Sequence, residues 1–362
     1  MGQLRARIKT TLDMLRREAI LSDTGFLRLL WKTGYFCVKT GLGPRYYVVA
    51  GMARETFPQT DQWLHISARE YHEALAVLNP PAYRKLTQNK LCEKALYSLM
   101  HIPTARMRGY YHPDKGITDY GQSLKNEEQL DGFLGTLKDH EVCLKPIEGW
   151  GGVGVKVGKV AIRNGQAVLR LAGSDTVLDA AAIIEAYRTS AEPAEFIIED
   201  RLRQSGQFDR FNPDSLNTFR LWVLRNADNR ISVLGGYLRV GRADSVIDNA
   251  SAGGLMCPVD VETGTLSYGI TKHSPHRDDF SAHPDHGAQL QGEVIDQWPE
   301  ICRFACDVLS RLPHTRFAGL DIAVTPDGPV LVETNPEPDK DGAAHANIPS
   351  VRLKEAAAAL KQ

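Results

Sequence analysis

The chain has 362 residues, of which 43% are hydrophobic and 24% are charged, and its formal net charge is -1. This composition is typical of a globular protein, and the length predicts two or three lobes that share a cleft. Because the net charge is small and no long block carries one sign of charge, the molecule as a whole has no electrostatic basis for coating nucleic acid or anionic lipid, and no nucleic-acid partner is expected.

The cysteines and the apolar segments bear on where the protein works. The six cysteines form no CxxC pair, which predicts free thiols in a reducing, cytoplasmic setting. Residues 26–52 are rich in Leu, Trp, Tyr and Val, but basic residues interrupt them, so no transmembrane segment is expected. The favoured interpretation of this stretch is ordinary helix packing, and the alternative is a basic, aromatic surface that contacts a membrane or a partner protein.

The first part of the chain has the periodicity of helices and turns. Ser67 and Glu70 have the spacing of a capping box, which predicts a helix that ends before Asn79 and the two prolines after it. A second helix is predicted from just after Thr87 to about Met100.

From residue 141 the pattern changes to short strands. Helices are predicted at 177–188 and 294–312, and strands at 141–145, 154–160, 196–198, 218–224, 231–240, 320–324 and 330–335. Because helices and strands alternate, the sequence predicts a mixed α/β (α+β) fold with mostly antiparallel pairing.

A glycine-rich loop at residues 145–154, KPIEGWGGVG, is the most informative segment. Glycines let backbone N–H groups approach phosphate oxygens, and Lys145 adds a positive charge just upstream. The loop glycines are Gly149, Gly151, Gly152 and Gly154. Strand-like alternation follows them, which predicts a flap between two strands that covers a nucleotide. The alternative is an ordinary glycine-rich hairpin.

Three other nucleotide motifs fail on their context. A Rossmann fingerprint needs a helix after the glycines, and a Walker A loop needs Gly-Lys-Ser/Thr. A protein-kinase interpretation fails because Arg163 stands where the motif requires lysine and no Asp-Phe-Gly follows.

A predicted hairpin near the C-terminus carries a second group of polar residues. Strand alternation puts Glu333 and Asn335 on one face, with Thr334 opposite. A five-residue loop at 325–329 would place Asp321 directly across from Glu333. Carboxylate and amide oxygens suit Mg²⁺, and the lack of His or Cys among the three disfavours zinc. The alternative is a surface hairpin whose acids face water.

These segments together resemble the ATP-grasp superfamily, and in particular its sugar-transfer-associated family, over about residues 84–335. The resemblance implies an ATP-grasp fold with two α+β lobes that clasp ATP. The first lobe, with the flap, would span 84–195, and the second lobe, with the metal site, would span 196–362. A helical region at 1–83 would precede them, in place of the small α/β domain that opens many ATP-grasp ligases.

The resemblance also implies roles for individual residues. ATP would be bound by two lysines, the four loop glycines and a hinge: Lys90, Lys145, Gly149, Gly151, Gly152, Gly154, Glu199, Asp200 and Leu202. Mg²⁺ would be held by Asp321, Glu333 and Asn335. The catalytic residues would be Arg220 and Arg239, which would face the γ-phosphate and the acyl substrate. Asn249 and His273 are expected to contact substrate, and Asp209 and Asp214 are candidates for a ribose-binding carboxylate.

The expected function is that of an ATP-dependent ligase that joins a carboxylate to an amine through an acyl-phosphate, releasing ADP and phosphate. Its partners would be a small-molecule carboxylate and a small-molecule amine. One alternative is an ATP-grasp phosphotransferase acting on a sugar or another small molecule. The other is a non-catalytic nucleotide-binding module in glycan assembly. The sequence leaves open whether the chain forms a homo-oligomer.

Overall fold

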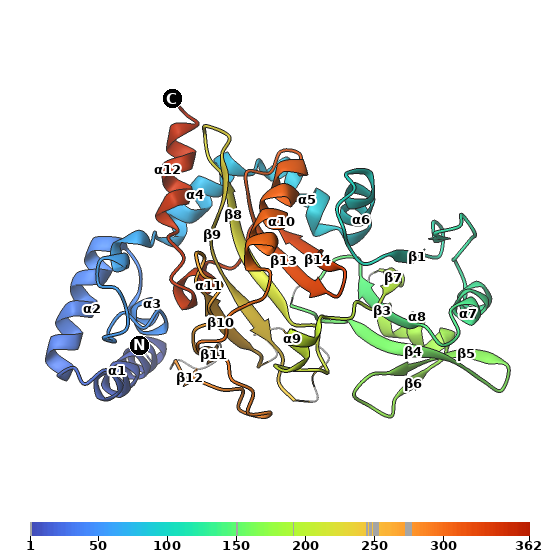
Figure 1. Cartoon of the computed structure of the whole chain (residues 1–362), viewed down its shortest axis with the longest axis horizontal. Helices are drawn as coiled ribbons and strands as arrows, with labels where there is room; N and C mark the ends of the chain where they lie inside the picture. Colours follow the sequence, from blue (N-terminus) through green and yellow to red (C-terminus); the bar gives the residue numbers. More distant parts are fainter. Residues whose placement is uncertain are drawn as a thin grey trace.

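The molecule consists of three parts that lie in a row. The computed structural model describes residues 2–149, 151–190, 192–243, 245, 248, 253–271 and 277–362. The helices of residues 2–49 form one end, a β-sheet with α10 (Trp298–Arg311) forms the middle, and another sheet with α7 (Glu127–Thr136) and α8 (Ala180–Tyr187) forms the other end (Figure 1). This arrangement confirms the mixed α/β class and the helical N-terminal region.

The N-terminal part is helical, as its periodicity predicts. Its helices are α1 (Gly2–Leu21), α2 (Phe26–Thr40), α3 (Pro44–Val49), the 3₁₀ helix η1 (Asp61–Leu64), α4 (Ala68–Leu78) and α5 (Pro81–Gln88). The predicted capping box begins α4: Glu70 N–H donates to Ser67 Oγ at 3.3 Å, and Ser67 N–H donates to Glu70 Oε2 at 3.0 Å. Such a cap stabilises a helix by about 1 kcal/mol. Helix α5 was not predicted. Its first residue is the second of the two prolines that follow α4, and proline is favoured at that position.

The first sheet contains seven antiparallel strands in the order β2-β1-β7-β3-β4-β5-β6 among the described residues. Helices α7 (Glu127–Thr136) and α8 (Ala180–Tyr187) cover one face of it and bury Phe133 and Ile183 against Leu144 and Phe196. The predicted helix at 177–188 begins later than expected because its first residues form β6. The strands are β1 (Met107–Tyr111), β2 (Ile117–Thr118), β3 (Glu141–Pro146), β4 (Lys156–Arg163), β5 (Gln166–Leu171), β6 (Val177–Leu178) and β7 (Phe196–Asp200).

The second sheet has the order β12-β11-β10-β9-β8-β13-β14 within the described ranges, again antiparallel throughout. Its strands are β8 (Thr218–Arg225), β9 (Ile231–Val240), β10 (Leu255–Val259), β11 (Gly269–Thr271), β12 (Asp279–Phe280), β13 (Phe317–Thr325) and β14 (Gly328–Asn335). The predicted β8–β9 pair and the β13–β14 hairpin are both present. The remaining helices are α6 (Lys90–Leu99), α9 (Gly206–Asp209), α11 (Lys340–His345) and α12 (Val351–Ala359).

Alternation along β8 shows how the second sheet divides its two faces. Leu221 and its odd-numbered neighbours pack beneath α10. On the opposite face, Trp222 and Leu224 pack against α4 and α12. Further along that same face the residues become polar, with Arg220 and Thr218, because the covering helices do not extend that far. A partly buried polar surface is therefore left between the two sheets.

Strand β7 belongs to the first sheet, where it pairs with both β1 and β3. A lobe boundary before residue 196, which the sequence analysis places there, assigns this strand to the second lobe. In the structure the chain crosses between the sheets after β7, so the hinge follows the strand.

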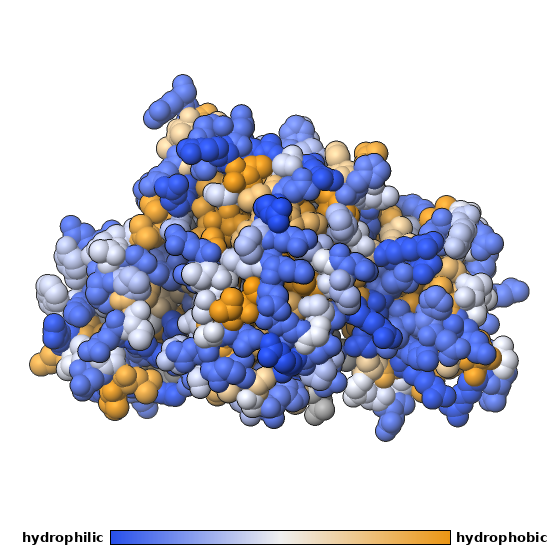
Figure 2. Space-filling view, viewed as in Figure 1, coloured by the Kyte–Doolittle hydropathy of each residue, from blue (hydrophilic) through white to orange (hydrophobic). Residues whose placement is uncertain are grey.

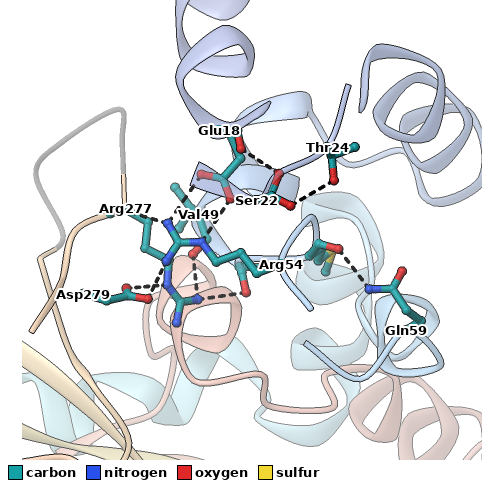
Figure 3. Close-up of polar contacts among 10 residues, drawn as sticks. Glu18, Ser22, Thr24, Val49, Arg54, Gln59, Arg277 and Asp279 are labelled. Carbon is teal, nitrogen blue, oxygen red and sulfur yellow. Dashed lines mark hydrogen bonds and ion pairs between the residues drawn. The ribbon is translucent and has the colours of Figure 1, made fainter. Parts of the chain in front are cut away.

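A charged network fixes the N-terminal helices to the second sheet (Figure 3). Arg54 lies at its centre: Nε is 3.0 Å from Glu18 Oε1 of α1, and Nη1 pairs with Asp279 of β12. Arg277 donates to Asp279 Oδ1 at 2.8 Å and to the carbonyl oxygen of Ala50 at 2.9 Å. These side chains are mostly buried, so removing one partner would leave a charge uncompensated.

Candidate active site

A cavity of about 510 Å³ lies between the two sheets and brings together most of the predicted site residues. It is lined from four directions: the glycine loop, helices α5 and α6, the hinge after β7, and the polar face of β8, β9, β13 and β14. The predicted residues on its wall are Lys90, Lys145, Gly149, Gly151, Gly152, Glu199, Asp200, Leu202, Arg220, Arg239, Asp321, Glu333 and Asn335. Gly154 is not part of this lining. Asn249 and His273 lie outside the described residues.

On the first sheet, strand alternation points a lysine and a glutamate into the cavity. Val142 and Leu144 face the core under α7 and α8, so Cys143 and Lys145 face the other way. Cys143 pairs across the ladder with Glu199 of β7. Lys145 Nζ forms an ion pair with Glu199 Oε1, and Lys94 Nζ of α6 lies 2.9 Å from Glu199 Oε2.

The Lys94–Glu199–Lys145 group therefore carries two positive charges and one negative charge. Although burial opposes ionisation, the two lysines hold the pKa of Glu199 below its ordinary value. Burial likewise opposes the charge on Lys145, but Glu199 raises its pKa above the usual value. The pKa shifts of Glu199 and Lys145 both favour their charged forms, and together with Lys94 the group contributes a formal net charge of +1 to the cavity.

On the second sheet, two arginines converge on one aspartate. Asp321 of β13 lies across from Arg220 of β8, and Thr218 lies across from Arg239 of β9. Arg220 makes a bidentate pair with Asp321, through Nε to Oδ1 and through Nη2 to Oδ2 at 2.8 Å. Arg239 Nη2 reaches Asp321 Oδ2 at 3.0 Å. Burial works against the charge on Asp321, but the arginines hold its pKa below the ordinary value.

Close packing behind this aspartate requires a glycine in β13. A Cβ on Gly319 would lie 2.7 Å from Pro338 Cβ and 3.1 Å from Arg220 Cδ. A larger residue there would clash with Pro338 and crowd the Arg220 stem, so glycine lets both pack against the strand next to Asp321.

Glu333 and Asn335 have the properties of cation ligands. Within the described residues, the Glu333 carboxylate has no hydrogen-bond or ion-pair partner. Among the same residues, the side-chain Nδ2 of Asn335 is buried and unpaired. Since the two ends of an amide are interchangeable in coordinates, an oxygen could occupy that position. A lone carboxylate beside a lone amide fits a hard divalent cation such as Mg²⁺.

Asp321, the third predicted ligand, is already engaged by the arginines. It would have to share an oxygen with a cation that Glu333 and Asn335 held. The described residues contain no group of three or more His, Cys, Asp and Glu side chains that could hold a metal.

Strand β14 lies at the edge of its sheet, and α6 covers that edge with a buried glutamate. Thr334 N–H donates to Glu93 Oε1 at 2.7 Å, and the Tyr97 hydroxyl bonds to Glu93 and, at 2.6 Å, to Thr334 Oγ1. Burial, reinforced by the nearby Glu333 carboxylate, raises the pKa of Glu93 to about 8. Glu93 is therefore protonated at neutral pH, and it fixes the strand without adding charge beside Glu333. Thr334 faces away from Glu333 and Asn335, as predicted.

The glycine loop joins β3 to β4, which confirms the predicted strand–loop–strand arrangement. Three of its glycines have positive backbone angles: φ is 68° at Gly151, 76° at Gly152 and 79° at Gly154. Other residues rarely adopt these values, so the loop needs glycine for its path. The Tyr187 hydroxyl donates to the carbonyl oxygen of Gly154 at 2.8 Å and ties the end of the loop to α8.

The remaining predicted residues differ in their surroundings. The Asp200 carboxylate lines the cavity but pairs with Arg108 at 2.7 Å. Asp209 accepts from Gln204 at 3.0 Å, and neither Asp209 nor Asp214 lines the cavity. The structure therefore assigns neither of them a place beside a nucleotide in the cavity.

Several residues on the cavity wall were not predicted from the sequence. Lys94 is the most important of these, and its spacing of four from Lys90 on one helix could have revealed it. Glu93 and the polar residues Thr218, Tyr237 and Asp248 have no such signal in the sequence. Lys85 of α5 pairs with Glu148 of the glycine loop at 2.9 Å, so the N-terminal helices also reach the cavity.

No curated protein matches the chain. Among solved structures, it is similar to the ADP complex of purK, an N5-carboxyaminoimidazole ribonucleotide synthetase, at 17% identity and a TM-score of 0.38, over 71% of this chain and 47% of that one. It is similar to the VanG D-Ala:D-Ser ligase from Enterococcus faecalis at 15% identity and a TM-score of 0.40, over 76% and 62%.

A third similar structure is the biotin carboxylase domain of the Hydrogenobacter thermophilus 2-oxoglutarate carboxylase, in complex with MgADP, ADP and bicarbonate. The identity is 12% and the TM-score 0.42, over 76% of this chain and 46% of that one. The chain spans less than two thirds of the length of each of these proteins.

The family assignment comes from the sequence itself. Residues 69–356 match the family described as "Sugar-transfer associated ATP-grasp". The match covers both sheets, the glycine loop, the hinge and the β13–β14 hairpin. The chain is a member of the sugar-transfer associated ATP-grasp family.

Proposed function

We propose that this protein is an ATP-dependent carboxylate–amine ligase that forms an amide bond through an acyl-phosphate and releases ADP and phosphate. The observation that carries the proposal is the position of Lys145 and Asn335 on the wall of one cavity. The lysine lies beside a glycine flap, and the amide lies beside an unpaired carboxylate. A triphosphate between them would have a positive group on one side and a cation site on the other.

The charge of the cavity wall favours binding of the nucleotide as a complex with a metal ion. Nine acidic and seven basic residues line the described part of the wall, and because Glu93 is protonated, eight acidic residues are set formally against seven basic ones. A triphosphate alone would meet net repulsion there, whereas a Mg²⁺-bound triphosphate brings the missing positive charge. Glu333 and Asn335 would hold that ion, which would neutralise charge on the transferring phosphoryl group.

The chemistry proceeds in two balanced steps. A carboxylate oxygen attacks the γ-phosphorus of ATP, the bond to the β-phosphate oxygen breaks, and ADP leaves. The amine nitrogen then attacks the acyl carbon, phosphate leaves with the bonding electron pair, and the amine loses a proton. Catalysis of the first step depends mainly on positioning and on positive charge around the phosphoryl oxygens.

Residues of this chain supply both requirements. Lys90 and the Lys94–Glu199–Lys145 group would orient the phosphates from the first sheet. Arg220 and Arg239 would bind the acyl substrate from the second sheet, since their guanidinium groups are held in place by Asp321. The glycine flap would exclude water, which would otherwise hydrolyse the acyl-phosphate.

The proposed partners are a small carboxylate and a small amine, in a protein that works in the cytoplasm. All six cysteines are free thiols, as a reducing compartment allows. No described helix is long and apolar enough to cross a membrane.

An ADP-release screen with pairs of carboxylates and amines tests the proposal, with hydroxylamine added in a parallel set. A ligase releases ADP only with both substrates present, and hydroxylamine converts its acyl-phosphate into a hydroxamate. A stable phosphoester in place of the hydroxamate would show a phosphotransferase. AMP as the steady product would contradict the mechanism.

A further inference from the structure

Helix α2 presents an apolar stripe to solvent. Leu27, Leu30, Trp31, Tyr35 and Val38 recur at helical spacing, and three of them are largely exposed: 78% for Leu27, 69% for Trp31 and 86% for Val38. We refer to these five residues as the α2 stripe. The opposite side of the helix is buried in the N-terminal core. Figure 2 shows hydrophobic residues at the surface of this end of the molecule.

The aromatic residues of the stripe contact one another and a neighbouring tryptophan. Trp31 and Tyr35 stack with ring centroids 5.7 Å apart, and Trp63 of η1 meets Tyr35 edge-on at 6.0 Å. Exposed tryptophan and tyrosine are the residues that proteins place at the boundary between lipid headgroups and acyl chains.

Basic residues run along one flank of the stripe. Each of three apolar residues is followed directly by a basic one, in the pairs Leu27-Arg28, Trp31-Lys32 and Val38-Lys39. At about 100° per residue, the three basic residues therefore share a side of α2 next to the stripe. The helix contains no acidic residue.

Charge is segregated between this end of the molecule and the rest. Residues 1–50 contain nine Lys and Arg but three Asp and Glu, a net charge of +6, whereas the whole chain has -1. The remaining 312 residues are therefore net negative. An anionic surface would attract the N-terminal helices and repel the catalytic lobes, which would orient the molecule.

We propose that the α2 stripe and its basic flank dock the protein on an anionic lipid bilayer. The helix would lie in the plane of the interface, with its apolar residues among the acyl chains and its Lys and Arg at the phosphates. A second copy of the chain is a poorer occupant, because two faces of charge +6 would repel each other. Protein interfaces also exclude lysine from their centres.

The charged network around Arg54 would keep the catalytic lobes in a fixed orientation relative to the docked N-terminal helices. It joins α1 to β12 through buried ion pairs (Figure 3), so the N-terminal helices are fixed to the second sheet. Docking of α2 would then hold the whole molecule at the bilayer.

Sedimentation with vesicles tests the proposal without any need for substrate. The full chain is mixed with vesicles of phosphatidylcholine alone, or of phosphatidylcholine with phosphatidylglycerol, at low and high salt. We expect binding to the anionic vesicles, weakened by salt, and a blue shift of tryptophan fluorescence. The double variant Leu27→Ser/Val38→Ser and the triple variant Arg28→Glu/Lys32→Glu/Lys39→Glu should each bind at least about tenfold more weakly.

Two control variants match these changes at other exposed sites. Leu99→Ser/Ile162→Ser removes two exposed apolar residues, and Lys138→Glu/Arg163→Glu/Arg170→Glu changes the net charge by the same amount. Both should bind as the unchanged protein does, and thermal melting confirms that each variant is folded.

Two results would overturn the proposal. One is equal binding by the α2 variants and their controls, or no binding to any vesicle. The other is a dimer, seen by light scattering, that Leu27→Ser/Val38→Ser dissociates, since the stripe would then be an interface between two copies. Because the assay uses no nucleotide or acceptor, either result leaves the proposed ligase activity standing.

Discussion

Asp321 lies directly opposite Glu333 in the β13–β14 ladder, and one extra residue in β14 puts it there. The hairpin closes tightly, with Thr325 paired to Gly328. That turn alone would set Asp321 opposite Val332. A bulge between the pairs Asp321–Glu333 and Ile322–Leu331 leaves Val332 without a partner and shifts the register by one. The bulge therefore puts Glu333 on the same face as Asp321, which lines the cavity.

Glu333→Gln tests the cation site. Loss of the charge should lower Mg²⁺-dependent turnover at least about 100-fold, and should raise the Mg²⁺ concentration needed for nucleotide binding. Folding should be unaffected, because Glu333 has no partner among the described residues and lies beside Glu93. Turnover and Mg²⁺ titrations of nucleotide binding measure the two effects.

Asp327→Asn is the matched control, since it removes an exposed carboxylate from the turn of the same hairpin. Equal kinetics for Glu333→Gln and Asp327→Asn would remove Glu333 from the site.

Lys94→Met should weaken nucleotide binding even though Lys94 is only 5% exposed. Without Lys94, the charge of Glu199 would be balanced by Lys145 alone, and the net +1 of the group would become zero. We expect the Kd for MgATP to rise about tenfold, which corresponds to about 1.4 kcal/mol. Calorimetry measures it. Lys159→Met, which removes an exposed lysine from β4, should leave the Kd unchanged, and an unchanged Kd in Lys94→Met would refute the charge argument.

Gly152→Ala tests whether the loop closes over the nucleotide. The φ of 76° at Gly152 is strained for alanine, so we expect a loss of stability of about 1 kcal/mol and a KM for ATP several-fold higher. Gly165→Ala, in the open turn between β4 and β5, has a similar φ of 84°. It should cost comparable stability without changing KM. If both variants change KM alike, the loop has no special role.

Through His65, the packing of the N-terminal helices against the rest of the protein becomes less stable at acidic pH. Its ring bonds to the Tyr46 hydroxyl at 2.8 Å and to Asn347 Oδ1 at 3.1 Å, and burial lowers its pKa to about 4. Because folding lowers the pKa of His65, the contribution of the neutral ring to the free energy of unfolding is fully present above about pH 6.5. That contribution is lost as the pH falls toward 4. The change amounts to about 3 kcal/mol.

Urea unfolding of the wild type and His65→Gln across this pH range checks the prediction. The variant should lack this part of the pH dependence, whereas the exposed His140→Gln should retain it. Parallel curves for the wild type and His65→Gln would contradict it.

Local patterns in the sequence predicted much of the fold and of the site. The strand at 141–145, the glycine loop that follows it and the opposition of Asp321 and Glu333 were predicted from residue order alone. The last was predicted from a five-residue loop, which was wrong, but the tight turn and the bulge together give the same pairing.

Other features depend on contacts between segments far apart in the chain. The Lys94–Glu199 pair and the Glu93–Thr334 bond join α6 to strands more than one hundred residues later. The place of β7 in the first sheet depends on its pairing with β1 and β3. Periodicity within one element carries no information about such partners.

A crystal structure with Mg²⁺ and a non-hydrolysable ATP analogue tests the central claim most directly. We predict one triphosphate in the cavity, with Lys145 contacting its phosphates from the first sheet and Glu333 and Asn335 holding the metal ion on its other side. A nucleotide bound elsewhere, or one that touches Lys145 while its metal ion lies away from Glu333 and Asn335, would contradict it.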